Sequence, residues 1–153
     1  MSKWLKIYKD QIKKEGSLNN FVTRKIDYKK KLIDMVCKYS GRNGRILEAG
    51  CGSGITCVHL GLLNYNVVGI DSDEGMLGFA RDFALKIKSP VDFKIGDIKN
   101  LDSNERYDVV FSNGVLEHFS DEDIIKIIND ELEITIFIAP SKVPEWILWS
   151  ATE

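Results

Sequence analysis

The sequence predicts an α/β domain built on a doubly wound, mainly parallel sheet, and two observations carry this prediction. In residues 45–56, a short apolar strand runs into a glycine-rich turn and then into a helix. Residues 67–71 are apolar up to a terminal Asp71, as expected for a parallel strand buried on both faces. Asp71 follows Gly54 by seventeen residues. This separation fits a helix plus a turn that returns the chain to the same edge of the sheet.

The composition indicates one ordinary globular domain. The chain has 153 residues, of which 44% are apolar and 29% are charged. It contains neither an apolar run long enough for a membrane span nor a signal peptide at its N-terminus, so we expect a cytoplasmic protein without membrane contact. Its three cysteines lack metal-ligand spacing, which argues against a disulfide framework and against a metal site.

The net charge of −2 hides an asymmetry along the chain. Residues 1–45 hold 13 Lys and Arg against 4 Asp and Glu, a net charge of +9, which leaves −11 for the remainder. A basic segment of this kind can cover an acidic body or meet an anionic substrate or a nucleic acid. Two helices with solvated lysine faces explain it equally simply, and we favour that interpretation.

The elements follow in order from the spacing of apolar residues. Residues 3–15 predict an amphipathic helix that Gly16 ends, 17–20 a polar loop, 23–39 a second helix and 40–44 a turn. Helices are expected at 55–63, after Asp73 and after the N-cap Ser120, and further strands at 91–95, 107–112 and 134–139. The residues expected to face the sheet are Ile55, Val58 and Leu62 in the first of these helices, Met76, Ala80, Phe83 and Ile87 in the second, and Ile124, Ile127, Ile128 and Leu132 in the third.

The turn itself points to a nucleoside ligand. Glu48, Gly50, Gly52 and Gly54 are spaced E-x-G-x-G-x-G, so the backbone can bend sharply and a ligand can approach main-chain N–H groups. An acid two residues before the first glycine favours a ligand with hydroxyl or ammonium donors, since it would repel a diphosphate. The third glycine of G-x-G-x-x-G is also missing, which makes dinucleotide binding the weaker interpretation.

This stretch resembles motif I of the class I S-adenosylmethionine-dependent methyltransferases, and three later stretches resemble the landmarks that follow it in that family. They are residues 67–71 (VVGID), 93–98 (FKIGDI) and 107–118 (YDVVFSNGVLEH). The resemblance implies a Rossmann-like sheet of about five strands in the order 3-2-1-4-5, with N-terminal helices over the cleft. We therefore expect a helical cap segment at 1–44 and a cofactor-binding region at 45–153 within one structural domain.

The resemblance also implies the cofactor, S-adenosyl-L-methionine, with S-adenosyl-L-homocysteine as product. Glu48 and the glycine turn would hold its amino-acid part, Asp71 its ribose, and Asp97 and Ile98 its adenine. Asp71 could also cap the helix from Asp73, which is compatible with a ribose contact, and the alternative for Asp97 is that it only stabilises its turn. The full set of cofactor-binding residues expected from the resemblance is Glu48, Gly50, Cys51, Gly52, Gly54, Asp71, Ser72, Met76, Asp97, Ile98, Asn113 and Gly114.

The residues after the fourth strand bear on the reaction. Asn113-Gly114-Val115-Leu116 lacks the prolines and the aromatic residue of the amide and base methylases, so the stretch resembles the small-molecule branch of the family. Glu117 and His118 are adjacent at the mouth of the expected site, and His118 is the candidate general base. A structural role for this pair is the alternative.

Three functions remain open. We favour methylation of a small-molecule acceptor; a non-catalytic S-adenosylmethionine-binding module and an RNA methyltransferase are the alternatives. In the N-terminal segment, Phe21, Arg24 and Tyr28 are candidates for ligand contact, although ordinary packing and solvation are favoured.

The end of the sequence differs from complete family members. Only fourteen residues follow Ala139, too few for the C-terminal antiparallel strands of that family. A fifth strand would then present a bare apolar edge. A homodimer formed through this edge or through the Trp-rich residues 146–149 is therefore one expectation.

Overall fold

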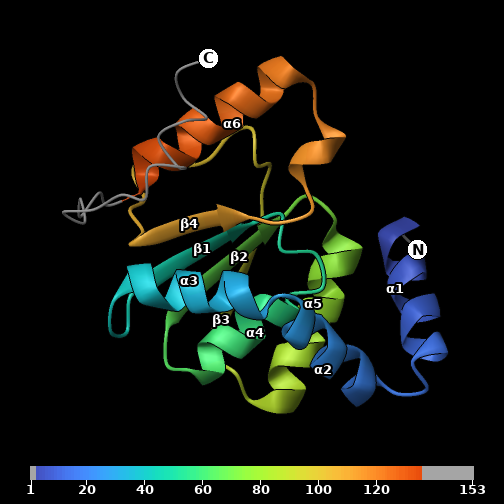
Figure 1. Cartoon of the computed structure of the whole chain (residues 1–153). Coiled ribbons are helices and arrows are strands. Elements are labelled where there is room, and N and C mark those ends of the chain that lie inside the picture. The colour runs from blue at the N-terminus through green and yellow to red at the C-terminus, as the bar shows by residue number, and fades with distance from the viewer. Residues whose placement is uncertain (1–2, 136–153) are drawn as a thin grey trace.

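Strands and helices alternate from Arg45 onward in the computed structural model, which describes residues 3–135 and leaves residues 1–2 and 136–153 undescribed (Figure 1). Three helices precede this alternation. The helices are α1 (Lys3–Lys14), α2 (Leu18–Tyr28), α3 (Lys30–Ser40), α4 (Ile55–Leu62), α5 (Glu74–Ile87) and α6 (Asp121–Ile134), with a short 3-10 helix, η1 (Leu116–His118). The strands are β1 (Arg45–Ala49), β2 (Asn66–Asp71), β3 (Val91–Ile95) and β4 (Val109–Ser112). None of these helices is long and apolar enough to cross a bilayer.

The four strands form one parallel sheet in the order β3-β2-β1-β4. Glu48 near the end of β1 lies opposite Gly69 of β2 and Phe111 of β4. The predicted α/β class, the parallel sheet and the order 3-2-1-4 are confirmed, and β3 lies at an edge as expected. This register brings the carboxyl ends of β1, β2 and β4 to one side of the sheet, where ligands bind in doubly wound folds.

The fifth strand predicted at residues 134–139 is wrong at its first residue, because α6 continues through Ile134. Ile134 lies seven positions after the buried Ile127 and completes the stripe of α6 that packs on the sheet. Thr135 forms a parallel bridge with Tyr107, just before β4. Residues 136–139, and the Trp-rich stretch considered for a dimer contact, lie outside the described residues.

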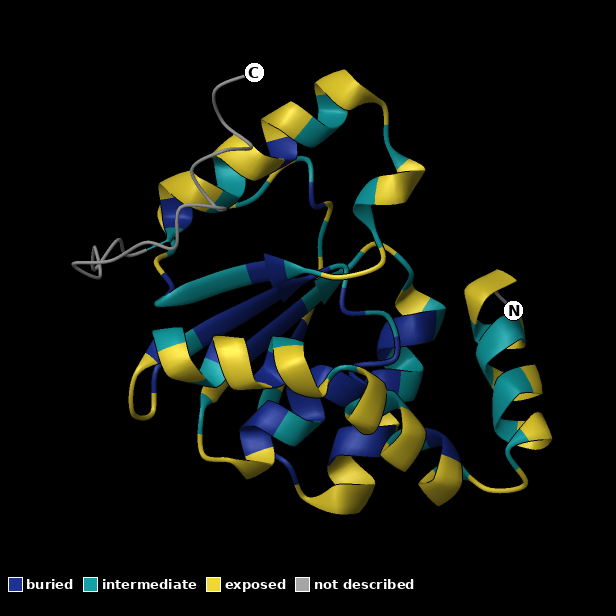
Figure 2. Ribbon diagram, in the orientation of Figure 1, coloured by how far each residue is buried: buried dark blue, intermediate teal, exposed yellow. Residues whose placement is uncertain are grey.

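Helices cover both faces of the sheet. Figure 1 shows α6 on one side and α3, α4 and α5 on the other. Neighbouring residues of β1 accordingly enter different cores: Ile46 packs with the cluster of α2 to α5, whereas Leu47 packs with Tyr107 and Ile134. The central strands β1 and β2 are buried from both sides (Figure 2), which explains their largely apolar sequences, whereas the edge strand β3 buries only Phe93 and alternates with charged residues.

The N-terminal segment departs from the prediction. The expected helix 23–39 is two helices, α2 and α3, separated at Lys29, and the expected polar loop 17–20 contributes the first turn of α2. Ser17 is the N-cap of α2, and its side chain accepts the main-chain N–H of Asn20 at 3.1 Å. The break at Lys29 involves neither glycine nor proline, so composition did not indicate it.

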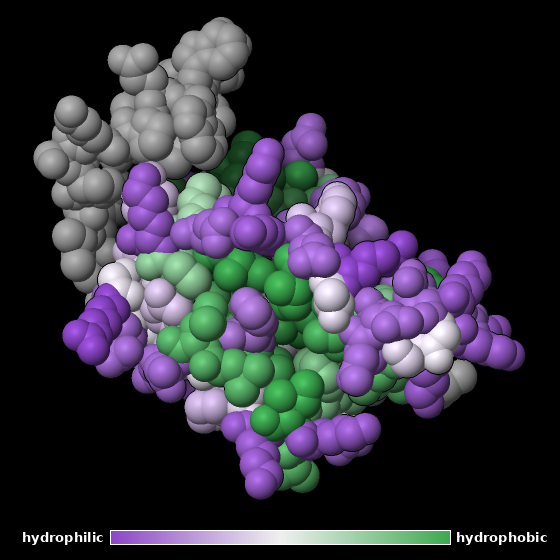
Figure 3. Space-filling model, turned by 60° about the horizontal axis from the view of Figure 1, so that its bottom comes forward, coloured by the Kyte–Doolittle hydropathy of each residue, from purple (hydrophilic) through white to green (hydrophobic). Residues whose placement is uncertain are grey.

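Four residues that were expected to face the sheet are exposed instead: Leu62, Ile87, Ile128 and Leu132. Leu62 and Ile87 are the last residues of α4 and α5. Figure 3 turns the side of α4 and α5 toward the viewer and shows hydrophobic residues gathered there among hydrophilic ones. The core-facing stripe of each helix is therefore narrower than its apolar pattern suggested.

Candidate functional site

A cavity of about 180 Å³ lies at the carboxyl ends of the strands. It is lined by eleven of the twelve residues that were expected to contact a cofactor: Glu48, Gly50, Cys51, Gly52, Asp71, Ser72, Met76, Asp97, Ile98, Asn113 and Gly114. The exception is Gly54. His118 also lines the cavity, whereas its neighbour Glu117 does not. The structure therefore brings together residues that are spread over 71 positions of the sequence, from 48 to 118.

The three glycines of the turn have different roles. All three adopt positive φ, with values of 72° at Gly50, 53° at Gly52 and 66° at Gly54. A Cβ at Gly54 would approach Cζ of Phe93 to 2.6 Å, so this glycine permits helix α4 to pack closely on β3. A Cβ at Gly52 would meet nothing closer than the Tyr8 hydroxyl at 3.8 Å, which leaves Gly52 open toward the cavity.

The main-chain N–H groups of this turn are already used within the protein. Those of Gly50 and Cys51 both donate to the carbonyl oxygen of Ile70 at 2.9 Å, and that of Gly52 donates to Oδ2 of Asp71 at 2.7 Å. In the structure, these three N–H groups therefore donate to protein acceptors. They are not available as donors to a diphosphate.

Asp71 ends β2 and lines the cavity beside the glycine turn. In addition to Gly52, it accepts the main-chain N–H of Asp73 at Oδ1, at 2.9 Å. The N-cap of α5 is Asp73, which accepts the N–H groups of Gly75 and Met76, so a cap role for Asp71 is ruled out. Asp71 instead holds the turn after β1 against the end of β2.

Glu48 is buried, with 1% of its surface exposed, and its oxygens face groups of the protein. The thiol of Cys57 donates to Oε2 at 2.9 Å, and Nζ of Lys29 lies 3.8 Å from Oε1. Lys29 also donates to the hydroxyl of Thr56 at 3.0 Å. Burial raises the pKa of Glu48 while the charge of Lys29 opposes that rise, and burial raises the pKa of the Cys57 thiol well above its ordinary value. Glu48 thus connects α2 to the start of α4.

The other end of the cavity is formed by the residues after β3. Asp97 is exposed, and its carboxylate accepts the main-chain N–H of Lys99 at 2.9 Å, so it does stabilise its own turn. Ile98 is buried and packs with Ala49 and Ile127. Both side chains still border the cavity, which leaves a contact with a ligand open to them.

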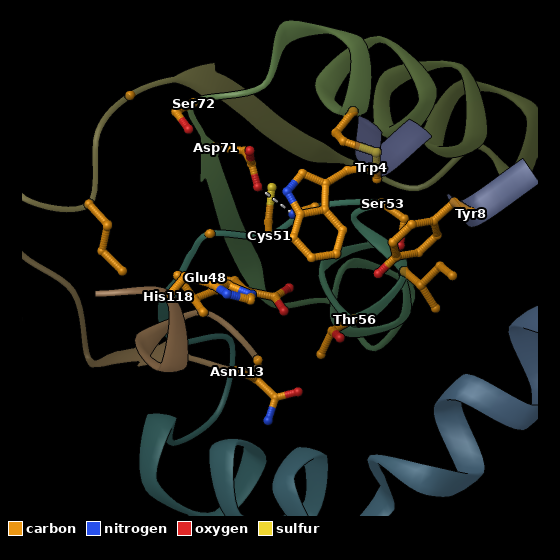
Figure 4. Close-up of a pocket in the computed structure, with 18 of the residues that line it drawn as sticks. Trp4, Tyr8, Glu48, Cys51, Ser53, Thr56, Asp71, Ser72, Asn113 and His118 are labelled. Atoms are coloured by element: carbon orange, nitrogen blue, oxygen red, sulfur yellow. Dashed lines mark hydrogen bonds between the residues drawn. The ribbon is translucent and has the colours of Figure 1, made fainter. Parts of the chain in front are cut away.

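The loop after β4 and helix α1 face each other across the cavity. Asn113 and Gly114 are exposed, and η1 follows them with His118 at its end. The imidazole of His118 lies against the indole of Trp4, with ring centroids 5.4 Å apart (Figure 4). Glu117 is turned toward Gly114, since its Oε1 lies 3.8 Å from the position of a Cβ there.

Sequence reasoning missed most of the N-terminal contribution. The cavity wall includes Trp4 and Tyr8 of α1, Lys25 of α2, and Lys29 at the junction of α2 and α3, none of which was predicted. Other lining residues that were not predicted are Ser53, Ile55, Thr56, Gly96, Val115 and Phe119.

The N-terminal residues that the sequence analysis named as candidates for ligand contact do not line the cavity. Phe21 is fully buried in the core, Tyr28 is 86% exposed, and Arg24 pairs with Glu15 at 2.9 Å. The available signal was the spacing of Lys25 and Lys29, four and eight positions after Phe21, which places Lys25 of α2 and Lys29 just after its end on the same side as the buried Phe21. Among residues 3–135, no group of three or more His, Cys, Asp or Glu side chains is placed to hold a metal ion.

Comparison with protein families matches residues 46–133 to a methyltransferase domain. The ubiquinone biosynthesis O-methyltransferase of Rhodopseudomonas palustris (strain HaA2) is 31% identical over 97 residues, which cover 58% of this chain and 38% of that protein. The ubiquinone biosynthesis O-methyltransferase of Pelagibacter ubique (strain HTCC1062) is 31% identical over 111 residues, which cover 69% of this chain and 46% of that protein. The chain thus spans less than half the length of these curated relatives.

Solved structures show the same architecture. TehB from Haemophilus influenzae superposes with a TM-score of 0.62 at 27% identity, covering 69% of this chain and 36% of TehB. Magnesium protoporphyrin IX methyltransferase from Synechocystis PCC 6803, determined with bound SAH, superposes with a TM-score of 0.67 at 20% identity. The superposition covers 88% of this chain and 66% of that protein. Because the identity to magnesium protoporphyrin IX methyltransferase is only 20%, this similarity concerns the fold alone.

Proposed function

Because the chain belongs to the class I S-adenosylmethionine-dependent methyltransferases through its methyltransferase domain at residues 46–133, we propose that it binds S-adenosylmethionine and methylates a small-molecule acceptor. The observation that carries the proposal is the position of Asp71. Its carboxylate ends β2, contacts the glycine turn after β1 and borders the cavity. A nucleoside placed there would meet an acceptor for its ribose hydroxyls at the place that this family uses.

The lining residues fit the cofactor in their chemistry. Asp71 would accept hydrogen bonds from both ribose hydroxyls, and Asp97 would accept one from the adenine amine. Ile98 and Met76 supply apolar surface for the adenine ring, and the open Gly52 lets the amino-acid part approach the backbone. When bound, the cofactor supplies a methyl group that its sulfonium already activates.

The chain's own contribution to the reaction is positioning and proton transfer. An imidazole accepts a proton near neutral pH, so His118 would take the hydroxyl proton of the acceptor as its oxygen becomes the nucleophile. The indole of Trp4 restricts the orientation of that imidazole. Asn113 and Gly114 would border the reacting atoms and help to align them.

We further propose that the acceptor atom is oxygen. The relatives named above are O-methyltransferases of ubiquinone biosynthesis, which supports this choice. The aromatic side chains of Trp4, Tyr8 and Phe119 along the cavity wall favour a planar acceptor. A hydroxylated aromatic compound has both properties.

Calorimetry with S-adenosylhomocysteine tests cofactor binding, and mass spectrometry of a panel of phenols incubated with S-adenosylmethionine tests transfer. His118→Ala should reduce kcat by about 100-fold while changing the affinity for S-adenosylhomocysteine little, because general-base catalysis contributes about 10²–10⁴. The matched control His59→Ala changes a part-buried residue of α4 and should leave both kcat and the affinity for S-adenosylhomocysteine unchanged. Cofactor binding without transfer to any phenol would favour the non-catalytic module, and steeply salt-dependent RNA binding would favour an RNA acceptor.

A further inference from the structure

The side chain of His118 is held at the cavity by an aromatic contact. In the described part of the chain, no hydrogen bond or ion pair engages its imidazole, and η1 fixes only its main chain, whose N–H donates to the carbonyl oxygen of Val115 at 3.1 Å. The adjacent Glu117 is turned toward Gly114 and does not pair with the ring. The indole of Trp4 lies against the imidazole instead, with ring centroids 5.4 Å apart and ring planes inclined by 54°. The orientation of the candidate base therefore depends on a residue 114 positions earlier in the chain.

Tyr8 anchors the helix that carries Trp4. No residue of α1 is buried, so this helix needs a fixed point on the core. Tyr8 follows Trp4 by one helical turn and packs edge to face on the fully buried Phe21, with ring centroids 5.8 Å apart and ring planes at 86°. Its hydroxyl lies 3.8 Å from the position of a Cβ at Gly52, beside the glycine turn. Tyr8 thus fixes α1 at the glycine turn, and Trp4 reaches across the cavity to His118 (Figure 4).

An aromatic partner suits a general base that must exchange a proton with a ligand. A base acts only when a ring nitrogen is aimed at the proton that it removes. Contact with the indole limits rotation of the imidazole about its side-chain bonds, yet it occupies neither ring nitrogen. Both nitrogens of His118 therefore stay available to an acceptor in the cavity, whereas a carboxylate partner would engage one of them.

We propose that Trp4 is the positioning residue of the methyl transfer, because its indole aims the imidazole of His118 at the acceptor hydroxyl. Helix α1 then takes part in catalysis although none of its side chains is buried. The inference rests on the proposed function, in which His118 is the base. It assigns the orientation of that base to the N-terminal helix and not to the adjacent Glu117.

A double-mutant cycle separates this role from simple contact with the acceptor. Transfer to a phenol is measured by mass spectrometry at saturating S-adenosylmethionine for the wild type, Trp4→Leu, His118→Ala and the double variant. Trp4→Leu should lower kcat about tenfold with little change in KM for the phenol, because the base is misaligned while the acceptor still binds. In the His118→Ala background it should cause no further loss, since Trp4 acts through His118.

Two matched variants control for the loss of an aromatic ring. Trp4→Phe keeps a ring beside the imidazole and should recover most of the lost kcat. Tyr28→Leu removes an exposed ring of α2 that does not line the cavity, and it should leave kcat unchanged.

NMR detects the ring contact without turnover. The chain has two histidines, His59 and His118, so the imidazole region of a ¹H–¹³C spectrum holds two sets of signals, which His118→Ala assigns. Trp4→Leu should move the signals of His118, because the ring current of the indole acts on them, and it should leave those of His59 in place.

Three results would overturn the proposal while transfer itself stands. They are unchanged His118 signals in Trp4→Leu, an equal loss of kcat from Trp4→Leu in both backgrounds, and a raised KM with unchanged kcat, which would assign Trp4 to acceptor binding. If the wild type methylates no phenol, the proposed function fails and the positioning role fails with it, even where the NMR signals show the contact.

Discussion

Replacing Asp71 by alanine tests the central contact of the site. The carboxylate accepts two main-chain N–H groups, that of Gly52 at 2.7 Å and that of Asp73 at 2.9 Å. Hydrogen bonds to a charged group contribute about 1.5–3 kcal/mol each at most, and the side chain is only partly buried, so the variant should lose about 2–3 kcal/mol of unfolding free energy. Urea denaturation measures this loss and shows whether the variant remains folded.

The effect on ligand binding is separate from the effect on stability. Losing the acceptor for two ribose hydroxyls should cost on the order of 2–3 kcal/mol of binding, which raises the Kd for S-adenosylhomocysteine about 30- to 150-fold. Asp71→Asn keeps one carbonyl oxygen but loses the charge, so its Kd should lie between those of the wild type and Asp71→Ala. Asp82→Ala, which removes an exposed acid of α5, is the control and should bind normally. Unchanged affinity in a folded Asp71→Ala variant would refute the ribose contact and the reasoning that places a nucleoside beside the turn.

Two further predictions concern stability. Gly54→Ala should lower the free energy of unfolding by about 2–3 kcal/mol in urea titration, since its Cβ would lie 2.6 Å from the Phe93 ring at a positive φ. The control Gly78→Ala has open space around its Cβ in α5 and should raise that free energy by about 0.5–1 kcal/mol. Equal effects of the two substitutions would contradict the packing argument. Burial raises the pKa of Glu131 to about 7, and its Oε1 has no hydrogen-bond partner in the described chain. The folded state therefore holds a proton that the unfolded chain releases near 4.5, so stability is highest below that pH and falls as pH rises through about 7. Thermal melts from pH 4.5 to 8 should show a flatter decline for Glu131→Gln than for the wild type or the exposed control Glu133→Gln, and parallel curves would exclude this titration.

Local spacing predicted the parallel strands and the position of Asp71 beside the glycine turn, whereas the strand order and the other cofactor-binding residues were implied by the family resemblance. The number of residues between the glycine turn and Asp71 depends only on one helix and one turn, and the register of parallel strands then brings both to the same edge. The N-cap at Ser120 is likewise a local feature, and its side chain accepts the N–H of Asp123 as expected. Features of this kind follow from the chain geometry within a few dozen residues.

The orientation of the Glu48 side chain could not be predicted from local sequence features. Its place just before the glycines suggested that it faces a ligand, but Lys29 and Cys57 take its oxygens. Those partners come from α4 and from a segment nineteen positions earlier in the chain. A sequence pattern shows which groups are able to pair, whereas the packing of helices selects the pairs that form.

The sequence by itself determined the alternation of strands and helices, the bend after the first strand and the acid that ends the second, because periodicity and turn length are properties of neighbouring residues. Only the tertiary structure decided that α1 and α2 supply Trp4, Tyr8 and Lys25 to the cavity. An amphipathic helix carries the same apolar stripe wherever it docks, so its sequence does not specify which strand ends its side chains will meet. That choice depends on the joint packing of segments far apart in the chain.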